Sequence, residues 1–105
     1  QGAWSVVRFF CADLNGEGID GGSMCVYFRE DADRFIVTDL GEAVHALRLR
    51  TGITYDEALA ILENAVGYEG DAFKKGADIM EIPKAADLPA AICRVMLAAY
   101  EVSRL

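Results

Sequence analysis

Apolar and polar positions alternate along two neighbouring stretches of the chain, residues 24–30 and 34–38. A repeat of two is typical of β-strands, because successive side chains point to opposite faces of the sheet. The acidic residues 30–33 form a tight connection between the two stretches, so the pattern predicts an antiparallel hairpin. Both faces of this hairpin carry apolar side chains, which favours a central strand pair that helices cover on one side.

Two further stretches are expected to complete a small sheet. Residues 3–11 are rich in β-branched and aromatic types and predict a strand, whereas residues 12–23 contain four glycines and predict a loop. Residues 77–82 predict a short strand that ends at Pro83, since proline lacks the N–H group that a strand ladder needs. The sheet should therefore contain about four strands.

A helix is expected over residues 39–50, directly after the hairpin. Asp39 can accept backbone N–H groups of the first helical turn, and Glu42, three residues later, completes a capping-box pattern. Gly52 is a common residue at a helix end. The apolar stripe of this helix is expected to consist of Leu40, Val44 and Leu47.

Two more helices follow. Thr54 and Glu57 form a second capping box at the start of a helix over residues 54–66. A third helix should begin at Asp87 as its N-cap, with Pro89 in the first turn. Its broad apolar stripe is expected to consist of Leu88, Ile92, Val95, Met96, Ala99 and Val102.

These elements predict one α+β domain over residues 1–105. A small antiparallel sheet of about four strands packs against three helices, in the order β-β-β-α-α-β-α. No apolar run approaches the ~18 residues that a membrane span needs. No pattern of a signal peptide is evident either, which favours a cytoplasmic location, although Gln1 need not be the natural start.

The charge of the chain is −7, and it is unevenly distributed. Residues 13–42 carry −6 and residues 54–71 carry −5, whereas residues 1–12, 43–53 and 72–105 carry +1, +2 and +1. Binding to nucleic acid depends on Lys and Arg at the phosphates, so the acidic blocks disfavour it. They favour a basic partner protein, with simple solubility as the alternative explanation.

The cysteines and the histidine do not form a recognisable metal or catalytic motif. Cys11, Cys25 and Cys93 are odd in number and far apart, and each lies in an apolar run. We expect them to be buried, reduced thiols. His45 has no nucleophile or acid tied to it by sequence, so a surface position is expected. No cofactor and no metal ion is expected.

The expected second helix has an acidic outer face without interleaved lysines, whereas solvated helices usually mix the two signs. This unmixed face favours a functional surface. The residues expected to bind a partner are the acidic ones of this helix, of the hairpin turn and of the segment after the helix: Glu30, Asp31, Asp33, Asp56, Glu57, Glu63, Glu69 and Asp71.

The residues Val37-Thr38-Asp39-Leu40-Gly41 resemble a motif, L-T-D-x-G, with Val in the first position. The motif ends a strand in an uncharacterised domain family of short bacterial, archaeal and phage proteins. The resemblance covers about residues 20–105 and implies no known activity. It does imply a phage or mobile-element gene, where small acidic proteins often inhibit host defence systems.

The leading hypothesis is a non-catalytic binding protein that engages a basic, nucleic-acid-handling partner, as an anti-CRISPR protein or another nucleic-acid mimic does. A toxin-neutralising immunity protein would share the acidity. A small metal-dependent nuclease is a third hypothesis, because Asp78, Glu81 and Lys84 resemble a D…E-x-K centre, although Pro83 interrupts the spacing. A further hypothesis is a self-associating subunit, for example a homodimer. Such a subunit would expose aromatic residues such as Trp4, Phe9, Phe10 or Tyr100.

Overall fold

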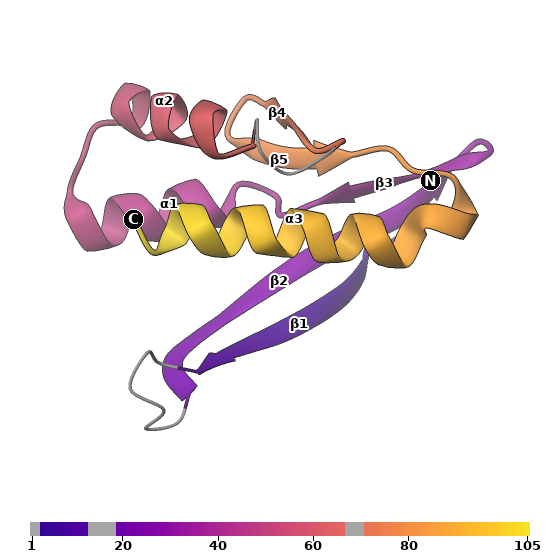
Figure 1. Cartoon of the computed structure of the whole chain (residues 1–105), viewed down its shortest axis with the longest axis horizontal. Coiled ribbons are helices and arrows are strands. Elements are labelled where there is room, and N and C mark those ends of the chain that lie inside the picture. Colours follow the sequence, from indigo (N-terminus) through magenta and orange to yellow (C-terminus); the bar gives the residue numbers. More distant parts are fainter. Residues whose placement is uncertain (1–2, 13–18, 67–70) are drawn as a thin grey trace.

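The structure is a computed structural model that describes residues 3–12, 19–66 and 71–105. Five antiparallel strands form one sheet in the order β1-β2-β3-β5-β4 (Figure 1). The strands are β1 (Ser5–Ala12), β2 (Ile19–Asp31), β3 (Arg34–Thr38), β4 (Phe73–Lys75) and β5 (Asp78–Glu81). The helices are α1 (Glu42–Thr51), α2 (Tyr55–Val66) and α3 (Leu88–Ser103), the last preceded by the short 3₁₀ helix η1 (Ala85–Asp87).

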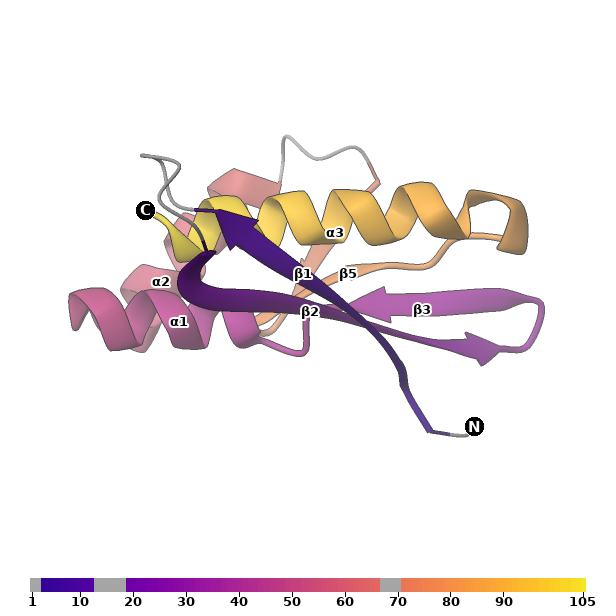
Figure 2. The same ribbon diagram turned by 90° about the horizontal axis from the view of Figure 1, so that it is seen from below.

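The helix α3 lies across one face of the sheet, and α1 and α2 lie beyond the ends of the shorter strands (Figure 1). The longest helix, α3, crosses β2, β3 and β5, and both α1 and α2 pack against α3. Seen from below, β1 and β2 lie in front of the helices, and no helix covers their near face (Figure 2). The molecule therefore has a helix-covered sheet face and an open sheet face.

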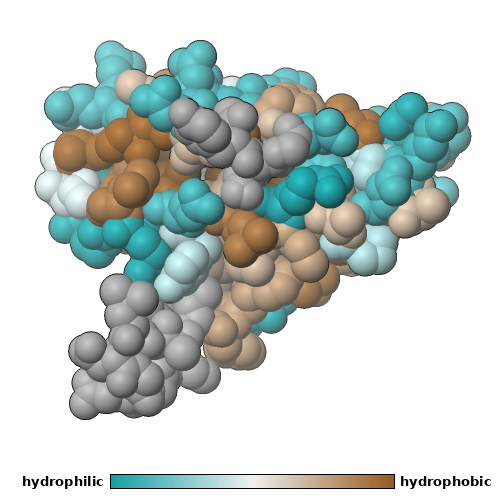
Figure 3. Space-filling model, viewed as in Figure 1, coloured by the Kyte–Doolittle hydropathy of each residue, from teal (hydrophilic) through white to brown (hydrophobic). Residues whose placement is uncertain are grey.

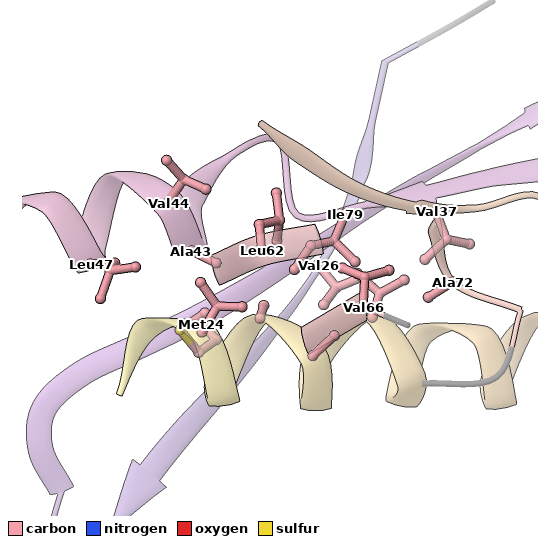
Figure 4. Close-up of a cluster of buried hydrophobic side chains, with 14 of the residues drawn as sticks. Met24, Val26, Val37, Ala43, Val44, Leu47, Leu62, Val66, Ala72 and Ile79 are labelled. Carbon is pink, nitrogen blue, oxygen red and sulfur yellow. The ribbon is translucent and has the colours of Figure 1, made fainter. Parts of the chain in front are cut away.

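The core fills the space between the sheet and the helices. Val26, Val37 and Ile79, from three neighbouring strands, are fully buried on the helix-covered face (Figure 4). The strand alternation directs these side chains to one side, and the apolar stripes of the helices cover them. The helices contribute small and branched side chains to this cluster: Ala43, Val44, Leu47, Ala58, Leu62, Val66, Ala91, Val95, Ala98, Ala99 and Val102.

The predicted α+β class and its order of elements are confirmed, with one strand more than expected. The extra strand, β4, has three residues, two of them lysines, and is too short and too polar to show in a hydrophobic pattern. β2 begins at Ile19, so part of the glycine-rich stretch predicted as a loop belongs to a strand. Residues 13–18 of that loop lie outside the described residues.

The start of α1 differs from the predicted capping box. The N-cap residue of α1 is Gly41, two positions after Asp39. Asp39 does accept the N–H groups of Gly41 and Ala43, but Glu42 instead accepts a hydrogen bond from the Tyr27 hydroxyl of β2. Leu40 was expected in the buried stripe, yet it is 42% exposed and has a φ of 53°. The backbone reverses there, because the N–H group of Leu40 bonds the Thr38 hydroxyl instead of entering the helix. Glu42 thus joins α1 to the sheet.

Asp87 is the N-cap residue of α3 and Pro89 lies in its first turn, as expected, but the Asp87 side chain makes no capping hydrogen bond. The 3₁₀ turn Ala85–Asp87 leads directly into the helix. One expectation about α3 is wrong. Cys93 is exposed on α3, whereas Cys25 is buried and reduced as expected. The side chain of Cys11 lies outside the described part of the structure. No helix within residues 3–12, 19–66 and 71–105 is long and apolar enough to cross a membrane.

The capping box at the start of α2 is confirmed and gives a first prediction. The Thr54 hydroxyl accepts the N–H group of Glu57 at 3.1 Å, and the Glu57 carboxylate accepts the N–H group of Thr54 at 2.9 Å. Thr54→Ala should lower the free energy of unfolding by about 1 kcal/mol, because one N–H donor loses its acceptor. Urea unfolding measures this loss. Thr54→Ser keeps the hydroxyl, so an equal loss in both variants would contradict the role of the cap.

Candidate functional site

The acidic residues of the hairpin lie at its tip. Glu30, Asp31 and Asp33 are all exposed, and Ala32 between them takes a φ of 56° to close the turn from β2 to β3. The adjacent hollow, about 550 Å³ in volume, is shallow and is lined by polar and apolar residues of β2, β3 and the start of β1. The hairpin therefore presents its carboxylates to solvent rather than enclosing a ligand.

The acidic residues of α2 lie at the other end of the molecule. Asp56, Glu57 and Glu63 are exposed, as expected, and Asp71 is exposed before β4. The hairpin tip and the first turn of α2 are at opposite ends of the longest axis, which extends over 39 Å (Figure 1). Glu69 lies outside the described residues. The eight expected binding residues therefore do not form one compact surface.

The edge of the molecule between these two acidic regions is polar, and its side chains carry both positive and negative charges. It includes β4, which carries Lys74 and Lys75. The space-filling view shows hydrophilic residues along this edge, interrupted by apolar ones (Figure 3). The structure thus separates α2 from the hairpin as two acidic regions with lysines between them.

The carboxylates of α2 have no ion-pair partner among the described residues, where Arg94–Glu81 is the ion pair present. The two arginines of α1 are engaged elsewhere. Arg48 donates to the Ile53 carbonyl oxygen and lies over the Tyr55 ring, and Arg50 donates to backbone carbonyls at the end of α3. The negative charge of α2 is therefore available to a partner.

An apolar hollow lies beside this acidic helix. Its volume is about 320 Å³, and it lies between α2 and the end of α3. Its floor consists of Ile61, Ala65 and Leu105, and Asn64 and Glu101 form polar parts of its wall. Glu57, four residues before Ile61, lies on the same side of α2. The hollow therefore has an apolar floor and carboxylates near its rim.

A second, polar hollow of about 540 Å³ lies between β4, β5 and the start of α3. Glu81 is 2% exposed on its wall, and both of its oxygens accept hydrogen bonds from the Arg94 guanidinium, at 3.1 and 3.0 Å from Nε. The carboxylate of Glu81 raises the pKa of Arg94 further above its ordinary value. Arg34, Lys84, Asp71 and Asp87 also line this hollow, so its charges are mixed.

The nuclease hypothesis required Asp78, Glu81 and Lys84 to share a metal ion. Asp78 and Glu81 are three positions apart in β5, so their side chains extend from opposite faces of the sheet. Both carboxylate oxygens of Glu81 also already accept hydrogen bonds from Arg94. No group of three His, Cys, Asp or Glu side chains that could hold a metal lies within the described ranges. This arrangement counts against the nuclease hypothesis.

The junction between β3 and α1 is built around one buried carboxylate. Asp39 is fully buried, and its oxygens accept the N–H groups of Gly41, Ala43 and Ile79 at 3.0, 3.0 and 2.9 Å. Burial raises the pKa of Asp39, and the three N–H donors oppose that shift. The carboxylate has a structural role, because it ties the helix start to β5.

The Tyr27 hydroxyl donates to the Glu42 carboxylate at the same junction. This hydrogen bond, together with burial, raises the pKa of Tyr27 above its ordinary range. His45, one turn into α1, is exposed, as expected. The Cys25 thiol lies beside the Tyr27 hydroxyl, and its interaction with that hydroxyl also raises the pKa of Tyr27. The junction therefore connects β2 to the start of α1 through the Tyr27–Glu42 hydrogen bond.

Sequence reasoning identified the acidic side chains of α2 but missed the apolar hollow beside them. Leu105 and Glu101 follow a long apolar stripe, and nothing in their spacing indicates that they meet Ile61 of another helix. The role of Arg94 was also missed. A lone arginine within an apolar helix is a signal for a buried carboxylate partner, and Glu81 in a predicted strand was the available candidate.

Comparison with protein-family models, curated proteins and solved structures found no match to this chain. The resemblance of residues 37–41 to the L-T-D-x-G motif therefore stays a prediction. What the structure adds is the physical role of those residues. They end β3 and turn the chain into α1 through the buried Asp39.

Proposed function

We propose that this chain is a non-catalytic binding protein that engages a basic partner through the exposed face of α2 and the adjoining hollow. The observation that carries the proposal is the coincidence of unpaired carboxylates and an apolar hollow on the same helix. Apolar floors with charged rims are typical of protein interfaces, because the floor supplies affinity and the rim supplies orientation.

The helix dimensions fit a partner segment lying along α2. Asp56 and Glu63 are seven positions apart and share one edge of its exposed face, and Glu57 and Asn64 share the other edge. A helix that carries leucines on one side and lysines on the other would place an apolar side chain over Ile61 and its cations near these carboxylates. The partner is therefore expected to be basic and amphipathic at the point of contact.

The concrete form of the proposal is an inhibitor of a host nucleic-acid-handling complex, comparable with anti-CRISPR proteins. Surfaces that bind phosphates are rich in Lys and Arg, so carboxylates on a rigid helix can compete for them. Asp56, Glu57 and Glu63 sit on such a helix. The nearby hollow would add apolar contacts that nucleic acid does not make.

The binding site is tested with a synthetic helical peptide that has leucines on one face and lysines on the other. Calorimetry should show binding that weakens as salt is raised, because screening reduces charge attraction. The test variant is Asp56→Asn/Glu63→Gln/Glu101→Gln, which spares the Glu57 cap. It should lower the affinity at least tenfold.

The hairpin provides a matched control with the same change in charge. Glu30→Gln/Asp31→Asn/Asp33→Asn also removes three carboxylates, at the opposite end of the molecule. Its affinity for the peptide should stay within about twofold of the unchanged chain. Equal losses in both variants would indicate attraction by total charge and would contradict a site on α2. An unchanged affinity in the α2 variant would contradict it as well.

The inhibitor form has its own test. A basic protein that binds the unchanged chain but not the α2 variant is purified, and its affinity for DNA or RNA is measured at increasing concentrations of the chain. Competition, in which the chain displaces the nucleic acid, is the expected result. A complex that holds the chain and the nucleic acid together would contradict the inhibitor form.

A further inference from the structure

The strand β1 forms one edge of the sheet and projects from the helical body. It pairs with β2 from Ser5↔Phe28 to Ala12↔Ile19, and its other side has no strand beside it in the described structure. Figure 1 shows the hairpin of β1 and β2 extending away from the helices. An edge strand of eight residues presents a row of free N–H and C=O groups to pairing.

The open face of this edge is apolar. Val7 lies opposite the buried Val26, so Val6 and Phe10 project from the other face of β1, which α3 does not cover. Val6 is 51% exposed and Phe10 is 64% exposed, the two largest values among the large apolar side chains of the sheet that the structure describes. Proteins usually protect such an edge with charges or prolines, and within β1 the only charged residue is Arg8.

Charge favours a second copy of this chain as the occupant of this edge. Residues 1–12 carry +1 and no acid, although the whole chain carries −7. Two copies that meet along β1 therefore join a segment that contains no acid in either copy, with α2 on the far side of the helices (Figure 2). Each copy brings one cation to this edge, Arg8.

We infer that β1 pairs antiparallel with β1 of a second copy, so that two five-stranded sheets join into one. An antiparallel edge is self-complementary under a two-fold axis, which is the symmetry of most homodimers. The ladder of β1 shifts register between Phe10 and Ala12, so the regular part lies before Phe10.

The position of Arg8 restricts the register. With the axis at Arg8, the two guanidinium groups would face each other, which is unfavourable. With the axis at Val7, Arg8 faces Val6 of the other copy, and Trp4 faces Phe10. Aromatic pairs across strands stabilise a sheet, so this register is the one inferred.

The test is the mass of the chain in solution between micromolar and millimolar concentrations. Analytical ultracentrifugation should show a rise from 11.4 kDa toward twice that mass as the concentration increases. Val6→Lys/Phe10→Lys should stay monomeric at every concentration, because a lysine at position 6 faces the cation of Arg8 of the other copy and the lysine at position 10 removes the aromatic pair. A chain that is monomeric throughout overturns the inference.

Phe73→Lys/Leu97→Lys is the matched control. These two residues are also exposed and apolar, but they lie on β4 and α3. The control should dimerise like the unchanged chain. A Val6/Phe10 variant that still dimerises, or a control that does not, overturns the inference.

Hydrogen exchange provides a readout that does not depend on substitution. The backbone amides of residues 5–10 should exchange more slowly as the concentration of the unchanged chain rises, since the outward N–H groups become bonded across the dimer. Protection that appears elsewhere but not in β1 contradicts the inference. None of these measurements uses the basic peptide, so their outcome is independent of the proposed binding site on α2.

Discussion

Asp39→Ala should lower the free energy of unfolding by about 3 kcal/mol or more, the largest loss expected from any single substitution in this chain. The change leaves the N–H groups of Gly41, Ala43 and Ile79 without their acceptor, and those of Ala43 and Ile79 are buried. Each buried donor without a partner costs about 1–3 kcal/mol. Urea unfolding followed by circular dichroism measures the loss.

Asp39→Asn separates the hydrogen bonds from the titration of the acid. The amide keeps one acceptor oxygen, so its loss of stability should be smaller than that of Asp39→Ala. Burial raises the pKa of Asp39 above 3.8, so the protonated acid favours the folded state. The stabilisation from protonated Asp39 is complete below pH 3.8 and is lost as the pH rises through the pKa that Asp39 has in the folded state. The difference in free energy of unfolding between the unchanged chain and Asp39→Asn should therefore decrease as the pH rises from 3.8. A difference that stays constant with pH would contradict the raised pKa of Asp39.

Arg94→Ala should be the second most destabilising change, at about 2–3 kcal/mol. It removes the guanidinium that binds both oxygens of Glu81, a carboxylate with 3% of its side chain exposed. Removing one partner of a fully buried pair costs about 3–5 kcal/mol. The Arg94 side chain is 31% exposed beside a polar hollow, so solvent screens part of this cost. Thermal and urea unfolding both measure the effect.

The controls for Arg94 address geometry and charge separately. Arg94→Lys keeps the charge but loses the two-pronged hydrogen bonding, so it should recover only part of the stability. Arg94→Met/Glu81→Leu replaces the pair with apolar side chains of similar size. It should be more stable than Arg94→Ala, because no buried carboxylate is left unpaired. A double variant that is no more stable than Arg94→Ala would indicate that the loss comes from packing.

Local signals in the sequence predicted most of the fold. The alternation in residues 24–30 and 34–38 placed the central hairpin, and the Thr54–Glu57 pair placed the start of α2. Such signals act over a few residues and depend only on the local backbone geometry and on the side chains of those residues. The strand β4 was not predicted, because three residues with two lysines form a strand only where β5 offers an edge to pair with. Its formation is a tertiary effect.

The candidate site was predicted less well than the fold, for the same reason. The helical spacing puts Asp56, Glu57 and Glu63 on the outer side of α2, so the sequence alone predicted their exposure correctly. Their separation from the hairpin acids depends on how α2 packs against the sheet, which no local pattern encodes. The meeting of Ile61 with Leu105 likewise depends on the contact between α2 and α3.

The position of β5 between β3 and β4 has a consequence for how the chain assembles. During synthesis β3 is made about forty residues before β5, and both helices α1 and α2 emerge in between. Until β5 arrives, β3 has a free edge, and Asp39 lacks the Ile79 N–H group that it binds in the finished fold. Closing this long connection costs chain entropy before its contacts form, which slows folding. The nascent protein is therefore most exposed to misassembly just before its last third leaves the ribosome.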